Sequence, residues 1–195
     1  MRRAATRARP ASDVTQPAGE GRTASAVTRR ATVAPPDATA VDDAVWIAAA
    51  LREGKRAGER GEIPIGAVVV RDGVVLARAG NATIAERDPS GHAEVRALRA
   101  AAAVADNHRL AGAVLYVTVE PCVMCMGAAL QARVARIVFG CADPKGGAAG
   151  TLYDLADDPR LNHRIVVTGG VRADACADLV QRFFRARRTA RPSRS

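Results

Sequence analysis

The earliest regular pattern in the chain is a helical one, between residues 42 and 60. Apolar residues recur there at the i, i+3, i+4, i+7 spacing that places them on one face of a helix: Ile47, Ala50, Leu51 and Gly54. Charged residues occupy the other face, and the side chain of Asp42 or Asp43 is placed to cap the first turn. We therefore predict an amphipathic helix that ends near Arg60.

The pattern changes to that of strands after this helix. Residues 65–71 and 74–79 are rich in apolar and β-branched side chains, and Asp72-Gly73 between them is typical of a tight hairpin turn. Three consecutive valines at 68–70 indicate a strand that is covered on both faces, because successive side chains of a strand point to opposite sides. The segment predicts an antiparallel hairpin in the core.

Helix and strand patterns then alternate to the end of the chain, after a polar loop at 81–91. The predicted elements are a helix from His92 to about Asp106, a strand at 113–119, a helix from Cys122 to about Ala132, a strand at 136–140, one helical turn at 152–156, a strand at 164–167 and a final helix at 171–188. This order predicts an α/β fold with three layers, α-β-α. A mixed five-stranded sheet carries helices on both faces, its first pair is antiparallel, and the later strands join through right-handed crossovers.

The net charge of +9 comes from the two ends of the chain. Residues 1–40 contain seven arginines and three acids, residues 185–195 contain five arginines and no acid, and the segment between them is balanced. The first forty residues show no apolar period that could pack. We therefore interpret 1–40 as a disordered extension, 41–188 as the folded domain and 189–195 as a disordered basic tail. The extension is either a dispensable leader or an accessory polyanion-binding arm.

Two further features limit the class of protein. The sequence has no apolar run long enough to cross a membrane and no apolar segment typical of a secretory signal. Four cysteines without an export signal favour a reducing cytoplasm, where a Cys-x-x-Cys pair is more often metal-binding or redox-active than a structural disulfide. Cys141 and Cys176 match no ligand spacing, so we interpret both as small buried apolar residues.

The residues that carry chemistry lie in two short segments, Gly91-His92-Ala93-Glu94 and Pro121-Cys122-Val123-Met124-Cys125. Cysteines three apart lie on one side of a helical turn, and two thiolates with one imidazole are ligands that suit zinc. Three protein ligands leave the fourth tetrahedral position for water, as in catalytic sites. The signature is that of the zinc nucleobase deaminases. The assigned residues are the zinc ligands His92, Cys122 and Cys125 and the acid/base group Glu94.

These groups together serve the removal of an amine from a ring carbon. Zinc lowers the pKa of water, and Glu94 would carry protons to the ring nitrogen and the departing ammonia. One geometric condition applies, because residues i and i+2 of a regular helix point about 200° apart. His92 and Glu94 can share a site only if His92 lies at an irregular helix start. The turn-forming Pro89-Ser90-Gly91 before it favours such a start.

One alternative is a closed metal site, in which a fourth protein ligand holds the fold and no catalysis occurs. His108 and His163 are the candidates for that ligand, and neither has a spacing that favours it. The glycine-rich segment at 143–150 suggests a phosphate-binding loop, but it lacks the spacing of one.

Beyond the zinc motif, the chain resembles the bacterial tRNA-specific adenosine deaminases over about residues 42–188. The residues that carry the resemblance are Glu62-Ile63-Pro64-Ile65-Gly66-Ala67-Val68, Asn81, Asp88-Pro89, His92-Ala93-Glu94, Leu115-Tyr116-Val117-Thr118, Glu120-Pro121-Cys122-Val123-Met124-Cys125, Asp143, Lys145, Gly147-Ala148-Ala149-Gly150, Asn162-His163-Arg164, Phe183-Phe184-Arg185 and Arg187-Arg188. The zinc motif alone would indicate only the broad cytidine-deaminase-like superfamily. The glycine-rich segment and the Phe-Phe-Arg terminus favour the tRNA branch.

The resemblance implies a cytidine-deaminase-like fold, one zinc ion per subunit and a homodimer. It implies that the enzyme converts the wobble adenosine of a tRNA anticodon to inosine, with the anticodon stem-loop bound across the subunit boundary. It further implies that Asn81 hydrogen-bonds the flipped nucleoside and that Lys145 contacts the substrate. The basic end of the final helix is expected to follow RNA phosphates, although arginine tails are often only solvated. The arginines concerned are Arg185, Arg187 and Arg188.

Two other functions stay open at this point. A free-base or nucleoside deaminase, acting on guanine or cytosine, would share the zinc motif but would not account for the Phe-Phe-Arg terminus. A catalytically silent RNA-binding module stabilised by zinc has no use for an acid that is not a ligand, so the presence of Glu94 argues against it.

Overall fold

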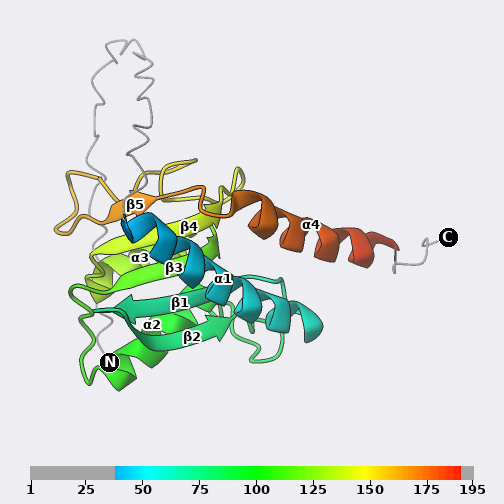
Figure 1. Cartoon of the computed structure of the whole chain (residues 1–195), viewed down its shortest axis with the longest axis horizontal. Coiled ribbons are helices and arrows are strands. Elements are labelled where there is room, and N and C mark those ends of the chain that lie inside the picture. Colours follow the sequence, from blue (N-terminus) through cyan, green and yellow to red (C-terminus); the bar gives the residue numbers. More distant parts are fainter. Residues whose placement is uncertain (1–37, 190–195) are drawn as a thin grey trace, which may run out of the picture. The chain divides into compact units, whose positions relative to one another are not determined.

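The computed structural model of the chain describes residues 38–189. That part of the chain contains four helices and five strands (Figure 1). The helices are α1 (Ala38–Glu59), α2 (Ala93–Val104), α3 (Val123–Ala132) and α4 (Ala173–Thr189). The strands are β1 (Gly66–Arg71), β2 (Val74–Gly80), β3 (Val114–Val119), β4 (Arg136–Cys141) and β5 (Val166–Thr168).

The strands form one mixed sheet in the order β2-β1-β3-β4-β5. β1 pairs antiparallel with both β2 and β3, while β3, β4 and β5 run parallel to one another. The hairpin turn is the predicted Asp72-Gly73, and its two residues have positive φ angles of 53° and 74°. Positive angles at both positions are what a tight two-residue hairpin turn requires. The predicted five-stranded mixed sheet is confirmed.

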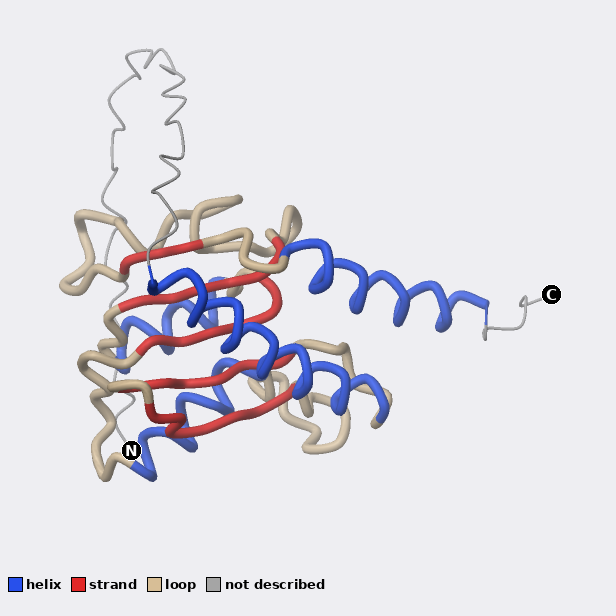
Figure 2. Tube along the Cα trace, viewed as in Figure 1, coloured by secondary structure: helices blue, strands red, loops and turns tan. Residues whose placement is uncertain are grey.

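Helices cover both faces of the sheet, with α2 and α3 on one side and α1 and α4 on the other (Figures 1 and 2). Val69 of β1 packs in the cluster that contains α2 and α3, whereas Val68 and Val70 pack in the cluster that contains α1. All three valines are buried, as their consecutive placement predicts. The three-layer α/β architecture is therefore confirmed.

The topology also brings the two chemistry-bearing segments together. Strands β2 and β3 both run antiparallel to β1, so their C-terminal ends lie at the same edge of the sheet. The segment after β2 leads to the start of α2, and the segment after β3 leads directly to the start of α3. The two helix starts that carry the predicted zinc ligands are consequently neighbours.

The predicted cap at Asp42 or Asp43 is wrong. The helix starts at Ala38, so both residues lie inside α1. Asp43 is buried, and its carboxylate accepts hydrogen bonds from the Arg136 guanidinium at 2.9 and 2.7 Å and from the Tyr116 hydroxyl at 3.1 Å. The local sequence around a buried acid that pairs with a distant cation can look the same as that around a helix cap. Only the fold shows which of the two roles Asp43 has.

Residues 152–156 do not form the predicted helical turn. The backbone N–H groups of Leu152 and Tyr153 both donate to the carbonyl oxygen of Gly147, and Gly150 N–H donates to the Tyr153 carbonyl. Ala149 and Asp154 form an isolated antiparallel bridge. Contacts with the glycine-rich segment therefore hold these residues in turns, which the local apolar pattern does not reveal.

The predicted extension and tail fall almost wholly outside the described residues. Residues 38–40 belong to α1, and Thr189 is the last residue of α4. No helix within residues 38–189 combines the length and the apolar character needed to cross a membrane.

Candidate active site

The start of α2 is irregular, as the placement of His92 and Glu94 in one site requires. His92 is the N-cap residue, with φ −71° and ψ 148°, an extended conformation outside the helix. The preceding turn is closed by Asp88, whose carboxylate accepts hydrogen bonds from the backbone N–H and the hydroxyl of Ser90 at 2.8 and 2.7 Å. The geometric condition on His92 is therefore met.

The start of α3 has the same form. Cys122 is its N-cap residue, with φ −75° and ψ 174°, and Cys125 lies one turn into the helix. Their Sγ atoms are 3.6 Å apart. Pro121 precedes the cap, and its missing N–H costs nothing where a helix begins.

The three predicted ligand atoms form a nearly equilateral triangle. His92 Nδ1 lies 3.7 Å from Cys122 Sγ and 3.5 Å from Cys125 Sγ. Tetrahedral zinc, with bonds of about 2.3 Å to sulfur and about 2.0 Å to nitrogen, requires about 3.8 Å between two sulfurs and about 3.5 Å between sulfur and nitrogen. The donor set fits such an ion. Within residues 38–189, these three side chains are the one set of histidine, cysteine or acidic residues whose ligand atoms lie close enough together to hold a metal ion.

Glu94 lies beside the triangle and is only 4% exposed. Its Oε2 atom has no hydrogen-bond partner among the described residues, so it can interact with a group held at the site. Burial raises the pKa of Glu94 above its ordinary value, against the opposing effects of backbone hydrogen bonding and the His92 ring. A carboxyl group with a raised pKa is suited to accepting and returning a proton near neutral pH.

The pKa values of the two thiols in the triangle shift in opposite directions. The pKa of Cys122 is lowered to about 3, first by its hydrogen bond with Cys125 and then by the one with His92. The pKa of Cys125 is raised by its hydrogen bond with Cys122 and by burial. The pKa of His92 is raised chiefly by its hydrogen bond with Cys122. Metal binding would displace the protons that the cluster holds.

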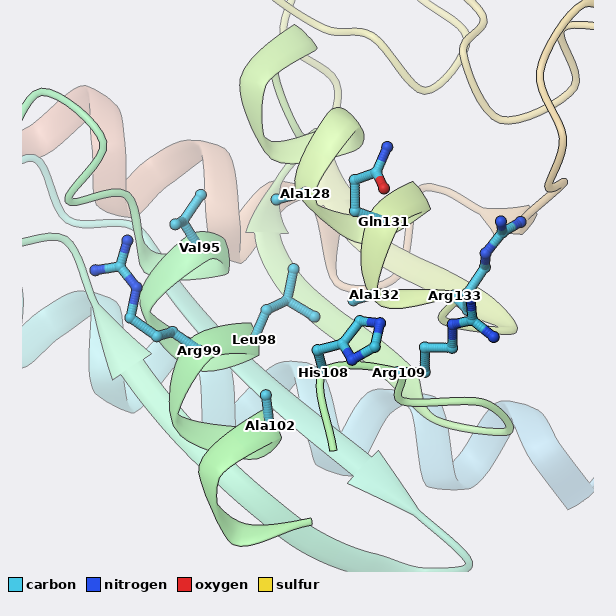
Figure 3. A pocket seen from close by; sticks show the side chains of 10 residues that line it. All are labelled: Val95, Leu98, Arg99, Ala102, His108, Arg109, Ala128, Gln131, Ala132 and Arg133. Carbon is cyan, nitrogen blue, oxygen red and sulfur yellow. The ribbon is translucent and has the colours of Figure 1, made fainter. Parts of the chain in front are cut away.

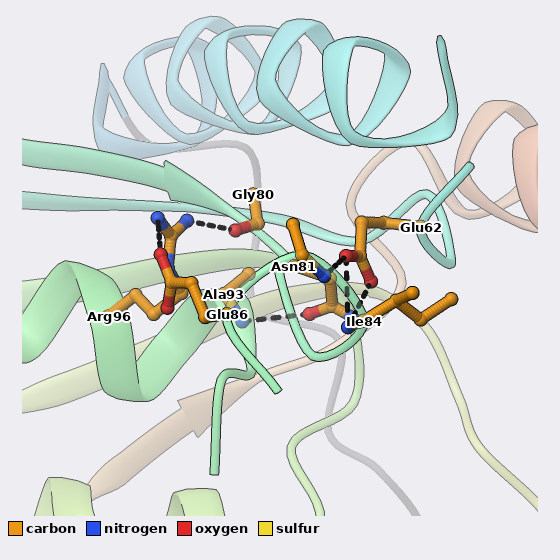
Figure 4. A network of polar contacts seen from close by, with 8 residues as sticks. Glu62, Gly80, Asn81, Ile84, Glu86, Ala93 and Arg96 are labelled. Atoms are coloured by element: carbon orange, nitrogen blue, oxygen red, sulfur yellow. Dashed lines mark hydrogen bonds and ion pairs between the residues drawn. The ribbon is translucent and has the colours of Figure 1, made fainter. Parts of the chain in front are cut away.

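Asn81 caps α2 from outside the helix. The side chain of His92 makes no cap hydrogen bond, and Asn81 Oδ1 instead accepts the N–H of Ala93 at 2.8 Å (Figure 4). Asn81 is itself buried at this helix start. Because its oxygen accepts this helix N–H, the NH₂ group of Asn81 is left as a donor for another partner.

The loop between Asn81 and His92 is anchored by Glu62. The buried Glu62 carboxylate accepts a hydrogen bond from the N–H group of Ile84 at 3.0 Å (Figure 4). It also accepts the N–H group of Ala85 at 2.8 Å and the Thr83 hydroxyl at 3.2 Å. Burial is the largest single influence and raises the pKa of Glu62, but the hydrogen bonds outweigh it. The pKa consequently lies below its ordinary value.

Sequence reasoning assigned no role to Glu62 or to Glu120, although both are buried. The available signal was an acid placed one or two residues before a proline, in Glu62-Ile63-Pro64 and in Glu120-Pro121. An acid close to a proline indicates a turn or the end of a helix or strand, but it does not predict which groups the carboxylate binds.

Lys145 lies on the loop after β4, at a cavity of about 500 Å³. Asp143 and Ile65 line the same cavity, and Phe184 of α4 lines it from the helix side. The structure therefore brings Lys145 towards α4.

The basic cluster predicted to meet RNA lies on the exposed last turns of α4, which extends away from the sheet (Figure 1). Arg187 stacks over the Phe183 ring at 5.4 Å from its centroid, and Arg185 donates to the Gln181 side chain at 3.4 Å. Together with Arg188 they lie on the α1–α4 side of the sheet. The structure does not bring them to the metal ligands, which lie on the other side.

The other two histidines do not complete a closed metal site. His108 is exposed and lines a groove of about 340 Å³ between the C-terminal halves of α2 and α3 (Figure 3). His163 lies with its Nε2 atom 2.8 Å from the carbonyl oxygen of Val134. Of the remaining cysteines, Cys176 is fully buried, whereas Cys141 is half-buried with its thiol near the Thr118 carbonyl.

Comparison with known proteins decides the family. A family model described as MafB19-like deaminase matches residues 41–188. The tRNA-specific adenosine deaminase of Bacillus subtilis (strain 168) is 44% identical over 143 residues, which cover 73% of this chain and 89% of that protein. The chain belongs to the tRNA-specific adenosine deaminase family. A second member of that family, from Haemophilus influenzae, is 44% identical over 140 residues, which cover 71% of this chain and 81% of its own.

Solved structures agree with this family and its fold. A structure from a study of A-to-I editing by tRNA:A34 deaminases at the wobble position is 42% identical, with a TM-score of 0.67, and covers 69% of this chain and 98% of that one. The guanine deaminase from Nitrosomonas europaea has a TM-score of 0.61 at 23% identity, a likeness that shows the fold alone. The expected cytidine-deaminase-like fold is confirmed for this family member.

Proposed function

We propose that this chain is a zinc-dependent deaminase that hydrolyses adenosine to inosine at the wobble position of a tRNA anticodon. The observation that carries the proposal is the donor triangle of His92, Cys122 and Cys125 with the buried, unpartnered Oε2 atom of Glu94 beside it. The tRNA-specific adenosine deaminases to which the chain is 44% identical support adenosine in tRNA as the substrate. We also propose a cytoplasmic location, because all four cysteines are free thiols.

The residues of the site have distinct tasks in this reaction. The three ligands would hold one zinc ion, which when bound supplies water activated for attack on the ring carbon that bears the amine. Glu94 would accept a proton from the attacking water, give it to the ring nitrogen, and then help to protonate the departing ammonia. The buried Oε2 atom of Glu94 has no hydrogen-bond partner among the described residues, so it is available for these transfers.

Substrate binding uses Asn81 at this centre and basic groups that lie farther from it. The NH₂ group of Asn81 donates a hydrogen bond to an acceptor atom of the nucleoside that has left the base stack. Lys145 and the basic end of α4 supply positive charge for the phosphates of an unpaired loop. These contacts orient the RNA, while the chemistry stays with Glu94 and the metal ligands.

We further propose that two copies of the chain pair through the outer face of α2 and α3. Ala129 of α3 packs into the core, whereas Gly127 and Ala128 are only half-buried. Apart from the nearby backbone of α3 itself, no described atom lies within 4 Å of the point where a Gly127 side chain would begin, and the groove next to Ala128 is open (Figure 3). A second helix can therefore approach closely. Sedimentation velocity tests this pairing, and a monomer at micromolar concentration would contradict it.

Product analysis with a panel of substrates tests the function. Purified zinc-loaded protein should form inosine in tRNA with a wobble adenosine, and should release far less ammonia from free adenosine, guanine or cytosine. Glu94→Gln should keep zinc and fold but lose at least about 10²-fold in rate, as expected for a general acid/base. Glu59→Gln, the same change at an exposed position, should leave the rate unaltered. Faster deamination of guanine or cytosine than of tRNA would instead identify a free-base deaminase.

A further inference from the structure

The buried carboxylate of Glu120 has a set of partners that the reaction itself does not require. Glu120 is 3% exposed and lies two residues before the ligand Cys122. Its Oε1 atom accepts the N–H groups of Ala149 and Thr151, each at 3.0 Å. Its Oε2 atom accepts the N–H of Asp143 at 3.1 Å and the hydroxyl of Thr151. No ion pair joins Glu120 to a basic side chain in residues 38–189, so backbone dipoles and one hydroxyl balance its charge.

All of these donors belong to one loop, residues 143–151, and they come from both of its ends. The loop also contacts the ligand segment directly, because Ala148 N–H donates to the Pro121 carbonyl at 2.8 Å. Gly147 forms an isolated bridge with Cys122. The glycine-rich segment is therefore folded around one carboxylate.

Close packing explains a glycine at the centre of this loop. A Cβ atom on Gly147 would lie 2.3 Å from Glu120 Oε2 and 2.7 Å from the Asp143 carbonyl oxygen, distances that no side chain tolerates. Four donors also match the acceptor capacity of an ionised carboxylate, which offers about four lone-pair sites. A glutamine at position 120 would place an NH₂ group, itself a donor, against some of these donors, and they would lose their acceptor.

The anchored loop carries two side chains that line a cavity next to α4. Asp143 and Lys145 line the cavity of about 500 Å³ that Ile65 and Phe184 also line. Asp143 Oδ1 accepts the N–H of Lys145 at 2.9 Å, so the two residues are held as one unit. The distance of this unit from the metal ligands depends on how firmly Glu120 holds the loop to the Cys122 segment.

We propose that Glu120 is a positioning residue that places Asp143 and Lys145 for RNA binding. Its carboxylate ties the loop at 143–151 to the Cys122 segment, and it acts on substrate affinity rather than on the deamination step. This inference rests on the proposed function, because it assigns the loop to the RNA substrate of the same site.

The test is steady-state kinetics on a synthetic anticodon stem-loop RNA with adenosine at the wobble position. Glu120→Gln should raise KM at least about 10-fold and change kcat by less than about 3-fold, while zinc stays at one per chain. Amide hydrogen exchange at Asp143, Ala149 and Thr151 should become faster in that variant. Glu59→Gln, an exposed control, should change neither constant. An unaltered KM, with kcat falling in step with zinc or folded fraction, would overturn the proposal.

A second substitution keeps the proposal testable if Glu120→Gln does not fold. Thr151→Val removes the hydroxyl donor to Glu120 on an exposed residue and should raise KM about 3-fold or more, whereas Thr151→Ser retains the hydroxyl and should restore the wild-type KM. Equal KM values for Thr151→Val and the wild type would overturn the assignment. A wild-type chain with no activity on this RNA would refute the proposed function, and the positioning role with it.

Discussion

The starts of α2 and α3 have the same backbone form but are stabilised in different ways. In each, the ligand residue is an extended N-cap whose side chain makes no cap hydrogen bond. At α2, the neutral amide of Asn81 caps Ala93. At α3, the Cys122 sulfur lies at the helix start, where the backbone N–H of Cys125 helps to lower the pKa of its thiol.

The identity of the ligand explains the difference. A thiolate carries a full negative charge that interacts favourably with the positive end of a helix, so Cys122 can be a ligand and stabilise the start of α3 together. The Nδ1 atom of His92 points to the two sulfurs, and a separate residue is needed to cap α2. Removing Cys122 should therefore affect both metal binding and the stability of the helix start. At α2, His92 binds the metal and Asn81 caps the helix, so the two functions can be changed separately.

Breaking the start of α3 should have the largest effect. Cys122→Ala removes a ligand and the negative charge at the start of α3, and Cys125→Ala removes a second ligand. We expect either variant to lose stoichiometric zinc and measurable deamination, and to unfold at a lower temperature, because metal binding is coupled to folding. Cys141→Ala removes a thiol outside the triangle and should keep its zinc. Metal analysis and thermal denaturation check this, and full zinc in Cys122→Ala would contradict the ligand assignment.

Two substitutions at Asn81 should separate capping from substrate binding at α2. Asn81→Asp keeps an oxygen for the Ala93 N–H but loses the NH₂ group, so we expect near-normal stability and a rate about tenfold lower, the value of one hydrogen bond. Asn81→Ala loses both and should also cost about 1 kcal/mol of unfolding free energy. Urea denaturation and single-turnover kinetics measure the two effects. Wild-type stability in Asn81→Ala would show that the cap is unimportant.

The ligands of both helix starts are predictable from the sequence, but their caps and anchors are not. His92, Cys122 and Cys125 fall in a short motif whose spacing itself describes the chemistry. Asn81 caps a residue twelve positions later, and Glu120 binds a residue 29 positions later. Local spacing contains no information about such partners.

The same distinction separates the correct from the incorrect parts of the fold prediction. The sheet and the four main helices follow from apolar periods within each segment, which are local properties. Asp43 was misinterpreted because its partner Arg136 lies 93 residues away. The turn at 152–156 was misinterpreted because its shape depends on the carbonyl group of Gly147.

Substitutions on α4 should leave both helix starts intact and alter only RNA affinity. Arg185, Arg187 and Arg188 changed together to Ala should flatten the slope of log affinity against log salt by about 2, at about 0.7 for each phosphate of a single strand. Zinc content should not change, and the rate at saturating tRNA should fall less than affinity does. A control variant with Ala at the exposed Arg52 and Arg60 should keep the wild-type slope. An unaltered slope in the α4 variant would mean that this cluster is only solvated.

The smallest effect should come from the carboxylate that anchors the loop before α2. Hydrogen bonds hold the pKa of Glu62 below its ordinary value of 4.5. Glu62 therefore contributes stability above that pH, and the contribution is lost as the pH falls from about 4.5 through the lower pKa of the folded state. We expect Glu62→Gln to be less stable by about 1 kcal/mol at pH 7. The variant should also lose stability less steeply below pH 4.5.

Urea denaturation between pH 7 and pH 3 measures this difference in slope. Glu59→Gln at an exposed position is the control and should follow the wild-type curve. Parallel curves for Glu62→Gln and the wild type would show that the carboxylate is not an anchor.

The crowding at Gly147 limits how two parts of this sequence can diverge. Any side chain there would collide with the carboxylate of Glu120, so position 147 accepts only glycine while position 120 is glutamate. A shorter acid at 120 would make room but would fall short of the N–H groups of Ala149 and Thr151. Among related sequences, the two positions should therefore change together or stay as they are, and a lone replacement at 147 would mark a chain whose loop has lost its anchor.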